Sequence, residues 1–297
     1  MAQSTKIRRF GLALSGGTLK AAAHVGVLSA LEDLGFHPDC IAGTSAGAIV
    51  ASLYAHGYRP TEMQQMIIKF PGVQLLDYGF PLLSSLLNYW RYRLPALKGQ
   101  NELTLAYGLI RGKKLYHYLD NLLKKRAARM PYYVIATDLW TGKPITFTND
   151  PARPCWPDMN DIQKPAAVVM GSCALPGILT PVTYSPYLLA DGALRHYVPV
   201  DVLRQAGCRR IVAVNLYRLD QNWQPQTFVH VLVRSLDILL QETVDQDTVG
   251  KDVMVLQPSI KEISWLSINH MRVNAVAGRV EVYGQADRLR SFLSSPD

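Results

Sequence analysis

Residues 10 to 56 constrain the fold most, because they contain one pattern twice. The apolar run FGLAL (10–14) ends in SGG, and the spacing of apolar residues after it predicts a helix that ends at Gly35. PDCIAG (38–43) predicts a second strand, which a turn and a helix to about His56 follow. Two successive strand-loop-helix units predict a parallel sheet with helices on its faces.

The rest of the chain continues this α/β pattern with one interruption. Further buried strands are predicted at 132–137, 187–190, 210–216 and 253–257, and helices at 113–129, 165–174, 199–206, 228–243 and 272–294. Residues 70–107 are rich in Leu, Tyr and Pro, which predicts either an acyl-binding cap or a helical pair that completes the core. We see no repeat or clear linker, so we expect one domain over residues 1–297.

Composition and charge limit the kinds of binding partner that we expect. The chain has 297 residues, of which 48% are hydrophobic and 18% charged, as in ordinary globular proteins. A net charge of +8 favours anionic surfaces, although the basic clusters at 113–114, 124–129 and 209–210 are also typical of solvated helix faces. There is no zinc-finger spacing or aromatic-basic RNA signature, so no nucleic-acid partner is expected. The oligomeric state stays undetermined.

Cysteine content and the N-terminus predict a cytoplasmic protein. The four cysteines (Cys40, Cys155, Cys173 and Cys208) are too scattered for a disulfide framework or a metal site. The N-terminus has only a five-residue apolar run, and no stretch approaches the roughly 20 apolar residues of a spanning helix. Any membrane contact is therefore expected to be peripheral.

The sequence GTSAG (43–47) matches the nucleophile-elbow pattern, in which a serine lies on a tight turn between a strand and a helix. Gly43 and Gly47 suit this turn, since side chains there would collide with the adjoining strand and helix. The pattern predicts Ser45 as a nucleophile at a helix start, where the helix dipole favours an alkoxide. The alternative is a small residue in a crowded turn.

A serine nucleophile needs a base. The histidines after Ser45 are typical of surface or core positions; they are His56, His117, His196, His230 and His270. A carboxylate is the other option, and Asp191 follows the apolar run YLLA, at a strand end where open α/β sheets place their sites. Asp191-Gly192 is also an ordinary turn pair.

The loop LSGGTLKAAAH (14–24) contains a second candidate element. Backbone N–H groups of Gly16, Gly17 and Thr18 at the start of a helix would suit an oxyanion. The loop lacks the spacing of a phosphate-binding or dinucleotide-binding motif. Lys20 is expected to face solvent and His24 to pack inside.

Together, SGGTLKAAAHVGVL, GTSAG and DGA resemble the patatin-like phospholipase family, as do ATDLWTGKPITF (136–147) and GSCALPGILTPV (171–182). The resemblance covers about residues 8–218, and residues 219–297 form a poorly matched, helical C-terminal extension. It implies a three-layer α/β/α sandwich around a mostly parallel sheet. It also implies Ser45 as nucleophile, Asp191 as base and Gly16, Gly17 and Thr18 as the oxyanion hole, with Gly43, Gly47 and Gly192 supporting the motifs.

The family's glycine loop usually reads Gly-Gly-Gly-x-[Lys/Arg]-Gly, and Thr18 and Ala21 replace its third and last glycines here. Both retain a donor N–H but disfavour backbone angles that only glycine adopts easily. The resemblance implies hydrolysis of lipid acyl esters, phospholipids or lysophospholipids among them, without metal or other cofactor. The alternatives are a soluble carboxylesterase or acyltransferase, or a catalytically silent lipid-binding regulator.

Overall fold

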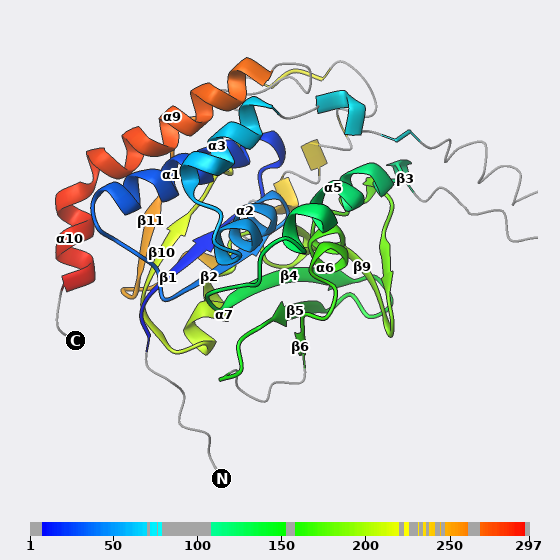
Figure 1. The fold of residues 1–297 in the computed structure, drawn as a ribbon, viewed down its shortest axis with the longest axis horizontal. Coiled ribbons are helices and arrows are strands. Elements are labelled where there is room, and N and C mark those ends of the chain that lie inside the picture. Colours follow the sequence, from blue (N-terminus) through cyan, green and yellow to red (C-terminus); the bar gives the residue numbers. More distant parts are fainter. Residues whose placement is uncertain are drawn as a thin grey trace, which may run out of the picture.

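In a computed structural model, the chain forms a mostly parallel β-sheet with helices on both faces (Figure 1). The described residues are 8–69, 72–75, 77–78, 108–152, 158–219, 223–225, 231, 234–235, 238–240, 244, 247–260 and 268–294. The predicted cap at 70–107 and the predicted helix at 228–243 therefore lie mostly outside the described residues.

The main sheet has the strand order β11-β10-β1-β2-β4-β5-β6. The strands from β11 to β4 are parallel, whereas β5 is antiparallel to β4. Their bounds are β1 (Arg8–Leu14), β2 (Cys40–Thr44), β4 (Tyr132–Asp138), β5 (Pro144–Thr148), β6 (Met159–Asp161), β10 (Cys208–Val214) and β11 (Val253–Leu256). β9 (Tyr187–Asp191) pairs with β4 and with β8 (Val182–Tyr184), and β3 (Gly108–Ile110) pairs separately with β7 (Gly177–Leu179).

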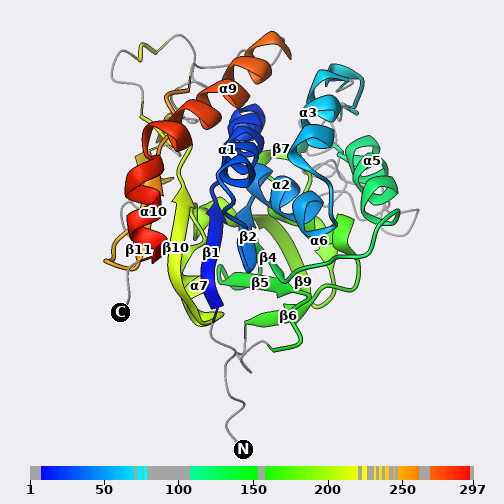
Figure 2. The same ribbon diagram turned by 60° about the vertical axis from the view of Figure 1, so that its left-hand side comes forward.

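Both faces of the sheet are buried. Leu12 and Leu14 of β1 point into one core and Ala13 into the other, because successive strand residues face opposite sides. The larger core lies under α1 (Ala22–Asp33), α2 (Ala46–Ala55), α3 (Pro60–Ile68), α5 (Lys113–Leu123), α6 (Pro165–Ser172), α9 (Ile268–Gly284) and α10 (Ala286–Ser294). α7 (Val200–Gln205) covers the opposite face (Figure 2). The predicted fold class is confirmed.

Two helix predictions were wrong in extent. The helix expected over 113–129 ends at Leu123, and the Arg126 guanidinium beyond it lies 2.7 Å from Glu62 of α3 and 4.0 Å from the Tyr58 ring. This basic cluster thus contributes a tertiary contact as well as a solvated face. The helix expected over 272–294 is divided at Gln285 into α9 and α10.

Short strands near the site were not predicted. β5, β7 and β8 have only three to five residues and partly exposed positions, so they lack the continuous apolar run typical of a buried strand. Among the described helices, none has both the length and the apolar character needed to cross a bilayer.

Candidate active site

Strands β2 and β9 meet end to end along one edge of β4. The last residue of β2, Thr44, lies opposite Ile135, and the last residue of β9, Asp191, lies opposite Ala136. β5 pairs with the opposite edge of β4 over most of the same residues, so β2 and β9 share the remaining edge. Because β2 is parallel and β9 antiparallel to β4, their carboxyl ends face each other.

Ser45 directly follows β2 and is the N-cap of α2, with a φ of 53° and a ψ of −126°. A β-carbon on Gly43 would lie 2.4 Å from the Gly47 oxygen, and one on Gly47 would lie 2.4 Å from the oxygens of Leu14 and Ser15. The turn therefore has the crowding that the GTSAG pattern predicts, and it places the Ser45 side chain at the amino end of a helix.

Asp191 accepts a hydrogen bond from the Ser45 hydroxyl, with 2.7 Å between Oγ and Oδ2. Its other oxygen, Oδ1, accepts from the Ala193 N–H at 2.9 Å. The Asp191 backbone is also held, since its N–H donates to the Ala174 carbonyl and its carbonyl accepts from the Thr137 hydroxyl, each at 3.0 Å. Gly192 follows without a side chain because a β-carbon would lie 2.2 Å from the Ile135 oxygen.

Burial determines the electrostatics of the pair. Ser45 is 8% exposed and Asp191 is 3% exposed. Burial raises the pKa of Asp191 to about 6, although the hydrogen bonds from Ala193 and Ser45 act in the opposite direction. The carboxyl group is thus mostly ionised at pH 7 and is a stronger base than an ordinary aspartate.

Ser172, at the end of α6, is a site residue that the sequence did not predict. Its hydroxyl donates to the Ile135 carbonyl at 2.5 Å and accepts from the Ser45 N–H at 2.9 Å. The Ser172 hydroxyl therefore links the backbone of Ser45, just after β2, to the backbone of β4. The only sequence signal was its place in the GSCALPG stretch.

The glycine loop differs from expectation at one of its three predicted donors. The Gly16 N–H donates to the Tyr197 carbonyl at 3.2 Å, so it is not a free donor in this structure. The N–H groups of Gly17 and Thr18 have no hydrogen-bond partner among the described residues. Gly17 is the N-cap of the 3₁₀ helix at Thr18–Ala21.

The two replaced glycines have different consequences. Ala21 has a φ of −56°, which any residue adopts in a helix. Thr18 has a φ of 48°, in the left-handed region where a side chain costs about 1–2 kcal/mol. The glycine loop therefore contains backbone strain at Thr18 and none at Ala21.

Ser45 and Asp191 lie on the wall of an apolar cavity of about 260 Å³. Its other walls are mostly aliphatic side chains of α1, α2, α3, α5 and the turn after α6. Thr18 also lines the cavity, as does Leu75, which belongs to the predicted cap region. Cys173 completes the wall beside Asp191, and burial raises the pKa of its thiol well above the usual range.

Among the described side chains, no histidine is hydrogen-bonded to Ser45. His24 is buried against the Ser15 carbonyl, and His56 contacts the Ser52 carbonyl of its own helix. His117 is on the exposed face of α5, and His196 contacts Asp247. The side chains of His230 and His270 lie outside the described residues.

Comparison with known proteins places this geometry in a family. The profile of the family described as "Patatin-like phospholipase" matches residues 12–204, well over half of the chain. The chain belongs to the patatin-like phospholipase family. Membership confirms the resemblance drawn from the motifs, and with it the enzyme class, a hydrolase of the patatin-like type.

Individual proteins resemble this patatin-like protein over two thirds or more of its length. It is 31% identical over 210 residues to "Uncharacterized protein YqhO" of Bacillus subtilis, covering 68% of this chain and 69% of that protein. It is 25% identical over 211 residues to "Lysophospholipase NTE1" of Meyerozyma guilliermondii, covering 71% of this chain but only 13% of that protein. The solved structure of VipD from Legionella pneumophila shares the fold, with a TM-score of 0.50 at 15% identity, covering 94% of this chain and 66% of VipD.

Proposed function

We propose that this protein is a serine acyl hydrolase that cleaves acyl esters of lipids, of the phospholipase A or lysophospholipase type. The observation that carries the proposal is the 2.7 Å hydrogen bond from Ser45 Oγ to Asp191, on the wall of an apolar cavity of about 260 Å³. A serine paired with its base can act as a nucleophile on an ester, and an aliphatic cavity favours an acyl chain.

The reaction would proceed in two halves. Asp191 takes the Ser45 proton while Oγ attacks the ester carbonyl carbon, and the negative carbonyl oxygen accepts hydrogen bonds from the Gly17 and Thr18 N–H groups. The tetrahedral intermediate then expels the alcohol, which receives the proton from Asp191. Water, deprotonated by Asp191, attacks the carbonyl carbon of the acyl-Ser45 ester. The second tetrahedral intermediate expels Ser45 Oγ, which takes the proton back from Asp191, and the fatty acid is released.

The test combines active-site labelling with product analysis. A fluorophosphonate should label wild-type protein at Ser45 and leave Ser45→Ala unlabelled. Mass spectrometry of a phospholipid mixture should show fatty acid and lysolipid only with the wild type, not with Ser45→Ala or Asp191→Asn. Hydrolysis that survives in Ser45→Ala would contradict the proposed nucleophile.

One observation favours a second candidate, a catalytically silent lipid-binding protein. The Gly16 N–H is occupied and Thr18 is strained, so the oxyanion hole has fewer donors than the motif predicts. A wild type that binds lipid but neither reacts with the fluorophosphonate nor releases fatty acid would support it. An esterase or acyltransferase would instead show a short-chain preference, or acyl transfer to an added alcohol.

The proposal includes peripheral contact with an anionic membrane on the cytoplasmic side. A net charge of +8 supports such contact, since basic residues near a surface each contribute about 1 kcal/mol of attraction to anionic lipid. Sedimentation with phosphatidylserine vesicles should exceed that with phosphatidylcholine vesicles, and salt should reduce the difference. Equal sedimentation with both would argue against charge-driven binding.

A further inference from the structure

The loop formed by residues 192–198 connects three parts of the candidate site. It begins directly after Asp191, and its His196 carbonyl accepts from the Thr44 hydroxyl at 3.0 Å, next to Ser45. Its Tyr197 carbonyl accepts from the Gly16 N–H at 3.2 Å. The base, the nucleophile turn and the glycine loop are thus connected through this one loop.

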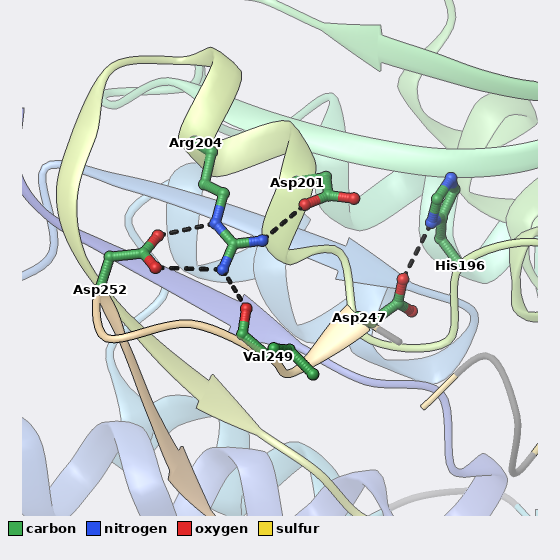
Figure 3. A network of polar contacts seen from close by, with 6 residues as sticks. All are labelled: His196, Asp201, Arg204, Asp247, Val249 and Asp252. Carbon is green, nitrogen blue, oxygen red and sulfur yellow. Dashed lines mark hydrogen bonds and ion pairs between the residues drawn. The ribbon is translucent and has the colours of Figure 1, made fainter. Parts of the chain in front are cut away.

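Asp247 holds the same loop from outside the segment that matches the family, which ends at residue 204. Its Oδ1 lies 3.0 Å from His196 Nδ1 (Figure 3). Its Oδ2 accepts from the Val198 N–H at 3.0 Å. The two contacts lie on either side of Tyr197, whose carbonyl receives the Gly16 N–H. The Asp247 side chain is 5% exposed.

A separate anchor holds the segment that carries Asp247. Arg204 of α7 donates to both carboxylate oxygens of Asp252, at 2.7 and 3.1 Å, and also to the Val249 carbonyl (Figure 3). Asp201 accepts from Arg204 at 2.8 Å. Arg204 fixes residues 249–252 independently of Asp247. Removing the Asp247 carboxylate would therefore release the 192–198 loop, while the segment at 247–252 would stay attached to Arg204.

We propose that Asp247 is a positioning residue of the active site, acting through the 192–198 loop on the glycine loop and the nucleophile turn. Its catalytic consequence rests on the proposed hydrolase function. Without Asp247 the Val198 N–H is buried without a partner, and the Tyr197 carbonyl is free to shift away from Gly16. A shift of about 1 Å in catalytic geometry is enough to reduce a rate about 100-fold.

A metal site is the competing interpretation of the same residues. Ligand-type atoms of His196, Asp201 and Asp247 lie within 4.8 Å of one another. Asp201 and Asp247 already accept hydrogen bonds from Arg204, His196 and Val198, which favours the positioning role. The two roles also predict different effects of asparagine. Its side-chain oxygen can accept from the Val198 N–H while its amide donates to His196 Nδ1 in the tautomer protonated on Nε2, but it lacks the charge that a carboxylate ligand supplies.

The experiment compares Asp247→Ala, Asp247→Asn and the control Asp252→Asn in the full chain. Asp247→Ala should lower kcat on a soluble ester about tenfold or more and change KM less than threefold, because Asp247 does not line the acyl cavity. Asp247→Asn should restore kcat to within threefold of the wild type. Asp252→Asn removes the charge of the neighbouring ion pair, but the asparagine oxygen and the Val249 carbonyl can still accept from Arg204. The segment therefore stays anchored, and kcat should stay within twofold.

Hydrogen exchange gives a readout that does not depend on activity. The amides of Gly16 and Val198 should exchange at least tenfold faster in Asp247→Ala and at the wild-type rate in Asp252→Asn. Should Asp247→Ala fail to fold, His196→Ala, which removes one of the two contacts, serves in its place. Unchanged Gly16 exchange, or failure of Asp247→Asn to rescue, would overturn the positioning role, whereas an inactive wild type with the expected exchange pattern would contradict only the hydrolase function.

Discussion

The Ser45–Asp191 pair and the glycine loop line the same cavity but differ in how their polar groups are hydrogen-bonded. The Ser45 N–H and hydroxyl and both Asp191 carboxylate oxygens are hydrogen-bonded. In the glycine loop, the N–H groups of Gly17 and Thr18 have no partner among the described residues, and Thr18 is strained. Under the proposed function, the nucleophile and base are therefore held in place before substrate binds, whereas the N–H groups proposed to bind the oxyanion have no partner among the described residues.

The largest effect on activity is expected at the Ser45–Asp191 pair. Asp191→Asn should reduce kcat about 10³–10⁴-fold, because it removes the base but keeps the shape of the side chain. In the wild type, kcat/KM should rise with pH around a midpoint near the Asp191 pKa of about 6, since only the carboxylate accepts a proton. A pH-rate profile measures this midpoint, and a limb near pH 4, where an ordinary aspartate titrates, would contradict the role of burial.

The crowded turn should be the next most sensitive position. Gly47→Ala should lower the free energy of unfolding by about 3 kcal/mol or more, because its methyl group would lie 2.4 Å from two carbonyl oxygens. Gly284→Ala is the matched control, since no atom lies within 4 Å of a β-carbon there. Urea unfolding compares the two; equal stabilities would show that the turn adapts more easily than the structure indicates.

His24 links the glycine loop to the stability of the fold. Burial lowers the pKa of His24 from 6.5 to about 4, so the unfolded chain binds the proton more readily. Because the pKa of His24 is lower in the folded state, the residue contributes about 3 kcal/mol to the free energy of unfolding. This contribution is present above pH 6.5 and is lost as the pH falls toward 4. Asp191, with a raised pKa, has the opposite pH dependence between about pH 6 and 4.

The difference in unfolding free energy between wild type and His24→Gln isolates the histidine, because the Asp191 contribution cancels. We expect this difference to change by about 3 kcal/mol between pH 7 and pH 4. A difference that is independent of pH would indicate that His24 is solvated and titrates normally.

The smallest effect is expected at Thr18 in the glycine loop, where a substitution should increase stability rather than decrease it. Thr18→Gly relieves about 1–2 kcal/mol of left-handed strain but adds about 0.5–1 kcal/mol of unfolded-state entropy, so stability should rise by at most about 1.5 kcal/mol. The N–H donor remains, so kcat should stay within twofold. Thr183→Gly, at an exposed position in β8, is the control and should be destabilising by about 0.5–1 kcal/mol.

Local patterns account for the predictions that the structure reproduces. The two strand-loop-helix units at the start correspond to β1, α1, β2 and α2, and the GTSAG turn has the predicted crowding. Asp191 was singled out by its position after an apolar run, and it lies at the end of β9 as that reasoning requires. Each of these features depends on side-chain periodicity or on glycine within a few residues, which one sequence displays directly.

Contacts between distant segments were decided only by the tertiary structure. Four such contacts join residues at least 37 positions apart. They are the end-to-end meeting of β2 and β9 along β4, the hydrogen bonds of Ser172, the bond from the Gly16 N–H to Tyr197, and the contacts of Asp247 with the 192–198 loop. Such pairings depend on strand register and direction. The apolar run at 187–190 predicted the strand β9 but not its antiparallel pairing with β4, and β5 was not predicted at all. The sequence by itself determined which residues could react and what turns they occupy; the sheet register determined that Ser45 and Asp191 lie 2.7 Å apart, because only packing of the whole chain brings two strand ends together.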